Sequence, residues 1–196
     1  MKNNIVILKL SIEKSVPEIF RLIQVPLNYT LFELHKIIQS CFLWSDSEIF
    51  AFNLNGNILN PEYLPGTLLV DVFNDKSNKL TYLYDPKDDW LINIDVQGFF
   101  FTDNLSDFPF CSDGQNASPP EGIGGILAYQ ELCLIINDSG NPKHKSALEI
   151  LGIEFDPTVF DPEEINYYLL DEGEMNSEFF DEFDDIDGFG ITNEDF

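Results

Sequence analysis

Basic residues are scarce in this sequence of 196 residues. Lysine and arginine together number 10, against 35 aspartates and glutamates, which gives a formal net charge of −25. Contacts to nucleic-acid phosphates need clustered lysine and arginine, and an anionic membrane repels a chain of this charge. The composition therefore argues against direct binding to nucleic acid or to a membrane, and it favours a basic protein as the partner.

Histidine and cysteine are also scarce. His35 and His144 are the two imidazoles of the chain, so general acid–base catalysis near neutral pH is poorly supplied. The cysteines, Cys41, Cys111 and Cys133, are odd in number and widely spaced, which predicts free thiols in a reducing cytosol. No motif indicates a cofactor, and none is expected.

Long apolar runs are absent as well. No run approaches the ~20 residues that span a bilayer, and the apolar stretch near the N-terminus is too short for a signal peptide. We therefore expect a cytoplasmic protein. The length fits one domain with an appendage and is sufficient for a sizeable core.

A central stretch organises the chain. Residues 81–84 and 90–96 are rich in aromatic and β-branched residues, which predicts two strands. Residues 85–89 between them combine proline and aspartate, which predicts a hairpin turn with an acidic tip. A loop is expected around Cys111. The prolines and glycines of residues 117–125 then predict a tight loop before an apolar helix.

The flanking segments predict an α+β fold, a mostly antiparallel β-sheet with packed helices. Residues 4–12 and 18–25 indicate a strand pair. Thr30 and Glu33 form a capping box that begins a helix, whose apolar residues recur at helical spacing. The other expected elements are a strand at 49–54, a turn at Asn55 and Gly56, loop-like residues 57–66, a helical turn or short strand at 68–73, and helices at 127–137, from Asn141 to Gly152 and from Asp161.

The composition changes at residue 171, which divides the chain into an α+β domain (1–170) and a tail (171–196). The tail has 11 acidic residues, five phenylalanines and no lysine or arginine. A segment of this kind is expected to be disordered when free. It is either a solvating tail or a binding segment, steered to a basic surface by carboxylates and anchored by phenylalanine. We favour the binding segment, because exposed phenylalanine promotes association.

Two patterns point to one family. Residues 82–90 read Tyr-Leu-Tyr-Asp-Pro-Lys-Asp-Asp-Trp, and Cys111 is followed by Ser-Pro-Pro-Glu-Gly-Ile-Gly-Gly at 118–125. They resemble the plasmid open-reading-frame-three-like proteins, TnpR-like passengers of transposable elements, and the resemblance extends over residues 4–170. The matching residues are Tyr82, Tyr84, Asp85, Asp88, Asp89, Trp90, Cys111, Pro119, Pro120, Glu121, Gly124, Gly125 and Tyr129, with His35, Trp44 and Asp46 matching upstream.

The departures from the family pattern fall on histidines and cysteines. Where the family has histidine, this chain has Glu48, Phe50 and Ile92. Where it has cysteine, this chain has Ser118 and Ile123. Histidine and cysteine are ligands of soft and borderline metals. If the family site binds a metal through them, this chain is a divergent member without that site, and a scaffold in which Ile92 contacts Ile123 is one hypothesis.

The preferred functional hypothesis is a non-enzymatic, acidic interaction protein. Its partner would be a basic protein that handles nucleic acid, for example an RNA-guided nuclease of the Cas9 type in a CRISPR system. The chain would act as an accessory subunit or as an inhibitor that mimics nucleic acid. A homodimer is also expected, since symmetric dimers are common and exposed aromatics need burial. The residues expected to bind the partner are Asp85, Asp88, Asp89, Trp90, Phe179, Phe180, Asp181, Phe183, Asp184 and Asp185.

The alternative is a metal-dependent hydrolase or nuclease. Asp85, Asp88 and Asp89 could supply hard oxygen ligands for Mg²⁺, with Asp46 as a further ligand. The simpler interpretation is a hairpin tip whose aspartates hydrogen-bond to the local backbone.

Overall fold

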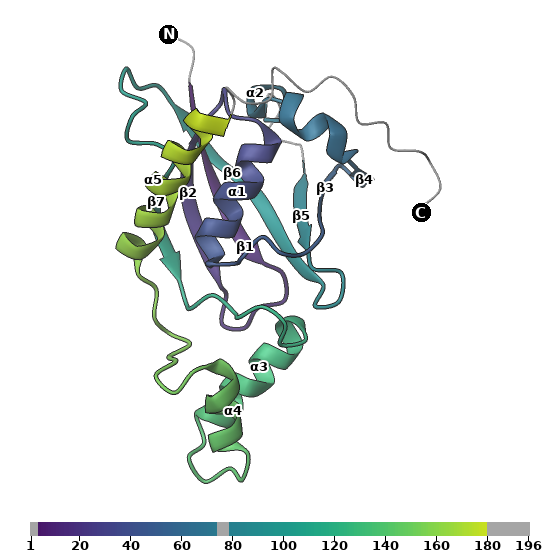
Figure 1. The fold of residues 1–196 in the computed structure, drawn as a ribbon, viewed down its shortest axis with the longest axis vertical. Helices are drawn as coiled ribbons and strands as arrows, with labels where there is room; N and C mark the ends of the chain where they lie inside the picture. Colours follow the sequence, from purple (N-terminus) through teal and green to yellow (C-terminus); the bar gives the residue numbers. More distant parts are fainter. Residues whose placement is uncertain (1–3, 74–78, 180–196) are drawn as a thin grey trace.

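The fold is an α+β arrangement around one antiparallel sheet, as the sequence predicts. A computed structural model describes residues 4–73 and 79–179, with the backbone alone for 171–179. Its seven-stranded sheet has the order β4-β3-β5-β6-β1-β2-β7, and every pairing is antiparallel (Figure 1). The strands are β1 (Ile5–Ile12), β2 (Phe20–Pro26), β3 (Phe50–Leu54), β4 (Asn57–Ile58), β5 (Leu80–Tyr84), β6 (Trp90–Phe100) and β7 (Phe110–Gln115).

One face of the sheet carries the core. Along β1, Val6, Leu8, Leu10 and Ile12 are buried, while most of the alternate residues are only half-buried, as expected for a sheet covered on one side. Helix α1 (Leu31–Phe42) lies across the covered face (Figure 1). The sequence therefore encodes the covered face through its alternation of apolar side chains.

The capping box predicted at the start of α1 is confirmed. The Glu33 backbone N–H donates to Thr30 Oγ1 at 3.2 Å, and the Thr30 N–H donates to Glu33 Oε2 at 2.6 Å. These bonds satisfy donors that the first helical turn leaves free. They fix where α1 begins, and so which of its side chains face the sheet.

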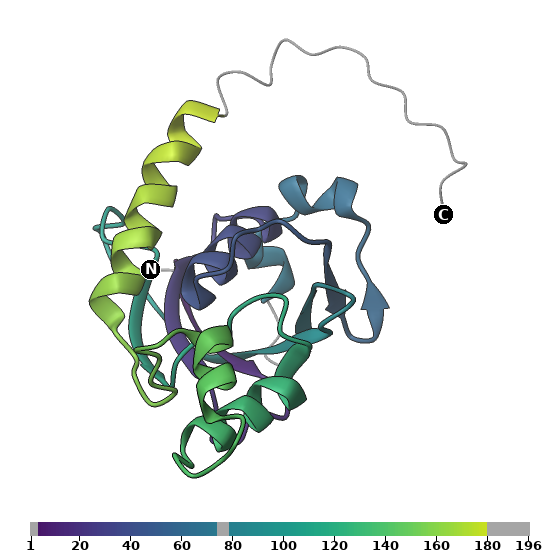
Figure 2. The ribbon, with the colours of Figure 1, turned by 60° about the horizontal axis from the view of Figure 1, so that its bottom comes forward.

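The remaining helices surround this layer. Helices α3 and α4 form a hairpin that projects beyond one end of the sheet, and α5 runs beside β7 and α1 (Figures 1 and 2). Among the described residues, none of the helices has the length and apolar character needed to cross a bilayer. The helices besides α1 are η1 (Pro61–Gly66, a 3₁₀ helix), α2 (Leu69–Val72), α3 (Gly125–Ile136), α4 (His144–Leu151) and α5 (Pro162–Phe179).

The predicted loop around Cys111 is wrong, because Cys111 lies within β7. Strand β7 is an edge strand whose pairing with β2 includes an irregularity near Leu22. The loop-like prediction for residues 57–66 also fails in part, since β4 and η1 fall there. Helix α4 begins at His144 and not next to Asn141, whose side chain accepts from the Lys143 N–H at 2.9 Å in a turn before the helix.

Helix α5 begins as predicted and continues across the expected domain boundary. Asp161 Oδ1 accepts from the N–H groups of Glu163 at 2.9 Å and Glu164 at 3.3 Å. The helix passes residue 170 and ends at Phe179. Residues 180–196, which include most of the acidic tail, lie outside the described residues, so the two-part division of the chain stays a prediction.

Candidate functional site

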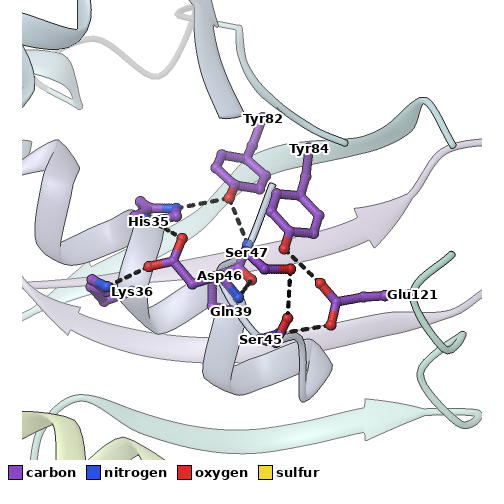
Figure 3. A network of polar contacts seen from close by, with 9 residues as sticks. All are labelled: His35, Lys36, Gln39, Ser45, Asp46, Ser47, Tyr82, Tyr84 and Glu121. Atoms are coloured by element: carbon purple, nitrogen blue, oxygen red, sulfur yellow. Dashed lines mark hydrogen bonds and ion pairs between the residues drawn. The ribbon is translucent and has the colours of Figure 1, made fainter. Parts of the chain in front are cut away.

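A polar network joins four segments that are far apart in the sequence. Figure 3 shows side chains from α1, from the loop after it, from β5 and from the loop before α3 pointing toward one another. Most of them match the family patterns identified in the sequence. Its members are His35, Lys36, Gln39, Ser45, Asp46, Ser47, Tyr82, Tyr84 and Glu121.

The centre of the network is a directed chain of hydrogen bonds. Gln39 Nε2 donates to the Tyr82 hydroxyl at 2.8 Å, and that hydroxyl lies 2.8 Å from His35 Nδ1. Because Tyr82 already accepts from Gln39, we assign its own hydrogen to His35 Nδ1. The imidazole hydrogen is then on Nε2, which lies 2.9 Å from Asp46 Oδ1. The His35 tautomer is thus set by its neighbours.

Asp46 closes this chain from the loop after α1. Its backbone has a φ of 55°, in the left-handed region that aspartate tolerates better than most residues. That conformation lets its N–H donate to Gln39 Oε1 at 3.1 Å while its carboxylate faces His35 and Lys36. The loop is therefore tied to α1 through both its backbone and its side chain.

Burial decides the protonation state of the network. Burial lowers the pKa of His35 to about 4, although the Asp46 carboxylate opposes this shift. Burial also raises the pKa of the Tyr82 hydroxyl far above its usual value. Both side chains are therefore neutral near pH 7. His35 is 1% exposed and Tyr82 is 0% exposed, so neither ring is open to a substrate, and their geometry fits the attachment of α1 to the sheet.

Glu121 extends the network to the loop before α3. Its Oε1 accepts from the Tyr84 hydroxyl at 2.6 Å and its Oε2 accepts from the Ser45 N–H at 2.8 Å. Burial and the Glu121 carboxylate together raise the pKa of Tyr84 to about 12. Nearby, Trp44 Nε1 donates to the Pro119 carbonyl at 2.9 Å. The Pro-Pro-Glu motif therefore holds its loop against the central hairpin.

The carboxylates of Asp85 and Asp88 at the hairpin tip accept hydrogen bonds from backbone N–H groups. Asp85 is buried, and its Oδ1 accepts from the Lys87 N–H at 3.0 Å. Asp88 Oδ2 accepts from the Gly124 N–H at 3.1 Å, just before α3. Among the side chains of residues 4–73 and 79–170, no group of three or more from histidine, cysteine, aspartate and glutamate is placed to hold a metal ion. The geometry agrees with the simpler interpretation of a hydrogen-bonded tip.

The residues expected to bind a partner fall into three groups: buried, at least partly exposed, and outside the described structure. Trp90 is 1% exposed and lies in the core against the Trp44 ring, and Asp85 is 4% exposed in the hairpin turn, so neither offers a surface to a partner. Asp89 is exposed and Asp88 half-buried, so binding through the tip stays a prediction for these two. The side chain of Phe179 and residues Phe180, Asp181, Phe183, Asp184 and Asp185 lie outside the described structure.

Two of the positions where the family has histidine border the His35–Tyr82 pair. The Phe50 ring stacks on the His35 ring, with centroids 3.5 Å apart and planes at 3°. Ile92 is fully buried and pairs with Tyr82 across the sheet. Ile92 and Ile123 both pack against the same core, and a direct contact between them stays a prediction. Phe50 and Ile92, two of the residues that stand in place of family histidines, thus pack beside the polar contacts of His35 and Tyr82.

We expect Tyr82→Phe to destabilise the protein by roughly 3 kcal/mol. The change leaves a Gln39 amide hydrogen and the His35 Nδ1 lone pair buried without partners, at about 1–3 kcal/mol each. Urea denaturation at pH 7 measures the loss. Tyr84→Phe is the matched control and should cost about 1 kcal/mol, because the half-buried Glu121 carboxylate can turn to water. Equal losses in the two variants would contradict the assigned network.

Arg21 is a residue that sequence reasoning passed over. It is the one arginine of the chain, and β2 places it in the interior at 2% exposure. The sequence shows that Arg21 is the one arginine, but neither the alternation of apolar residues nor the composition predicts that a charged side chain is buried.

Comparisons with known proteins agree with the motifs. Residues 4–164 match a protein family described as plasmid pRiA4b ORF-3-like protein. The chain is 26% identical over 162 residues to the uncharacterized protein y4hQ of Sinorhizobium fredii (strain NBRC 101917 / NGR234), covering 78% of this chain and 83% of y4hQ. A crystal structure of MM3350, a protein of unknown function from Methanosarcina mazei Go1, has the same fold. It superposes with a TM-score of 0.75 and 29% identity, over 84% of this chain and 98% of MM3350.

Proposed function

The chain belongs to the plasmid pRiA4b ORF-3-like family, and from that premise we propose that it is a non-enzymatic, acidic interaction protein. Its partner is a basic protein that handles nucleic acid, for example an RNA-guided nuclease of the Cas9 type. The chain acts there as an accessory subunit or as an inhibitor. The plasmid association of the family favours partners of this kind.

The charge of the described surface supports this proposal. Lysine–carboxylate ion pairs join Lys9 to Glu18, Lys87 to Glu48 and Lys36 to Asp46 within residues 4–73 and 79–179. The other carboxylates whose side chains the structure describes, in residues 4–73 and 79–170, have no lysine or arginine within ion-pair distance. A field of this sign accelerates encounter with a basic protein and repels nucleic acid.

The observation that carries the proposal is the outer face of α5, defined here by Glu163, Tyr167 and Leu170. Spaced at i, i+4 and i+7, they fall on one side of the helix. Tyr167 is 69% exposed and Leu170 is 56% exposed, beside an exposed Glu163 carboxylate. Exposed apolar side chains on a charged helix mark an interaction surface. This face leads along the chain toward the acidic, phenylalanine-rich tail.

The same face is less suited to a homodimer. A two-fold dimer built on α5 would bring together two chains that already carry −25 each. A basic partner removes that repulsion and covers the same apolar side chains. We therefore propose a heteromeric complex in preference to self-association.

We expect Glu163→Lys combined with Tyr167→Ala to abolish partner capture. The change reverses one charge and removes one anchor on the outer face of α5, and neither side chain has a buried role. Tagged protein is purified from its host at low and high salt, and its partner is identified by mass spectrometry. A basic, nucleic-acid-handling protein should be recovered at low salt, released at high salt, and at least about tenfold depleted with the variant.

The matched control is Asp71→Lys combined with Val70→Ala on α2. It makes the same kinds of change at two exposed residues on a different helix, and it should leave capture intact. Loss of capture in both variants would show that only net charge matters. Capture unaffected by the α5 variant, or a partner that is not basic, would refute the proposal. Light scattering on the purified chain tests self-association separately.

A further inference from the structure

The guanidinium of Arg21 is buried, and no residue that the structure describes gives it an anionic partner. Its Nε donates to the Cys41 carbonyl at 3.1 Å, and Nη1 donates to the carbonyls of Phe20 at 2.7 Å and Gln115 at 3.1 Å. Nη2 donates to Ser118 Oγ at 2.8 Å. Carbonyl dipoles and a hydroxyl thus surround the charge, and within the described residues no carboxylate lies within 4.0 Å of it.

This arrangement is unexpected for a chain so rich in carboxylates. Buried charges are normally paired, since burial without a counter-ion is costly. The rings of Phe42 and Phe160 lie 5.3 and 4.7 Å from the Arg21 guanidinium carbon, which stabilises the cation but does not neutralise it. An unbalanced positive charge in the interior therefore indicates an anion that the described residues do not provide.

A cavity of about 420 Å³ lies over Arg21. Its walls come from the end of α1, the Ser118–Pro120 loop and the connection from α4 to α5. Nη2 has two hydrogens, of which Ser118 takes one, and the Ser118 hydroxyl has its own hydrogen to donate. Arg21 and Ser118 can thus offer two donors to one carboxylate at the base of the cavity.

The rim of the same cavity has the opposite charge. Glu154, Asp156, Asp161 and Glu164 all line it. The carboxylates of Asp156 and Asp161 are engaged by Thr158 and by the first turn of α5. The carboxylates of Glu154 and Glu164 are therefore the ones that can bind the ammonium group of a ligand. The aromatic side chains of Phe155 and Phe160 also line the cavity.

We propose that this cavity binds a free α-amino acid with an apolar side chain. The ligand carboxylate meets Arg21 Nη2 and the Ser118 hydroxyl, and the ammonium meets Glu154 and Glu164. The side chain lies against Phe155 and Phe160. The volume is near the lower end of the range of about 300–1,000 Å³ for small-molecule sites, which suits a ligand of this size. The inference does not depend on partner binding, since the outer face of α5 is a different surface.

Calorimetric titration of the full chain with L-leucine and L-phenylalanine tests the site. Leucinamide, which lacks the carboxylate, and N-acetyl-leucine, which lacks the ammonium, are the matched ligands. Saturable binding of a free amino acid, lost with both derivatives, is expected. Binding that survives amidation or acetylation would overturn the proposal, as would no saturable binding of either amino acid up to about 10 mM.

Variants locate the binding in the cavity. Ser118→Ala and Glu164→Gln should each weaken binding about tenfold, while Glu149→Gln, an exposed change on α4 outside the cavity, should leave it unchanged. Arg21 is kept, because its removal would leave three backbone carbonyls without their donor. Equal affinity in all three variants would place the ligand elsewhere and refute the site. Circular dichroism melting shows that each variant is folded.

Discussion

Replacing Gly125 with alanine is expected to destabilise the protein by at least about 3 kcal/mol. Gly125 has a φ of +78°, and a Cβ there would lie 2.1 Å from the carbonyl oxygen of Asp88. The left-handed conformation alone costs a non-glycine residue about 1–2 kcal/mol. The clash is with backbone, so the hairpin tip must separate from α3 to relieve it, at a further cost of about 1–3 kcal/mol. Urea denaturation measures the total.

Gly122→Ala separates these two costs. Gly122 has a φ of +73°, but nothing lies within 4 Å of the position its Cβ would take. This variant should lose only about 1 kcal/mol, from conformation alone. If both variants lost the same amount, the close approach of Asp88 to Gly125 would not be a real constraint on the fold.

Acidification is expected to cost the fold about 2 kcal/mol between pH 7 and pH 5 through His35 alone. Burial holds the pKa of folded His35 at about 4, whereas a histidine in the unfolded chain titrates near 6.5. The unfolded state therefore binds more protons between pH 6.5 and 4, so stability is full above 6.5 and is lost as the pH falls toward 4. Urea denaturation at a series of pH values follows this loss.

His35→Gln provides the reference, because glutamine does not titrate. Protonation of surface carboxylates also changes stability in this range, by relieving repulsion among the acidic residues, and this contribution is common to both proteins. The difference in stability between wild type and variant should therefore shrink by about 2 kcal/mol from pH 7 to 5. A constant difference would mean that His35 is not held neutral in the fold.

Local patterns in the sequence predicted most elements of the fold. The capping box at Thr30 and the alternation along β1 depend on neighbours within a few residues, so the sequence displays them directly. Strand β7 was missed because its residues, Phe110–Gln115, include serine, aspartate and glycine, which are poor strand formers. They form a strand because β2 offers an open edge, and that pairing joins segments about 90 residues apart.

The candidate site was predicted in parts and not as a whole. His35, Asp46, Tyr82 and Glu121 each matched a family pattern, but their convergence depends on how α1 crosses the sheet. Asp85 was expected at the surface because aspartate is usually exposed, yet the turn satisfies its carboxylate and buries it. Burial of Arg21 depends on the α4–α5 connection folding back over β2, and no local pattern encodes that contact.

The aromatic cluster beside the polar network also determines which part of the protein its intrinsic fluorescence reports on. The chain has two tryptophans, Trp44 and Trp90, whose ring centroids are 5.7 Å apart, and Trp44 stacks on Tyr84 at 5.0 Å. The Trp90 indole N–H is buried and has no hydrogen-bond partner in the part of the chain that the structure describes. Intrinsic tryptophan fluorescence thus comes from one place, the attachment of α1 to the central hairpin. The fluorescence will change when this attachment unfolds, and it will change little when the α3–α4 hairpin unfolds or when a ligand binds the outer face of α5.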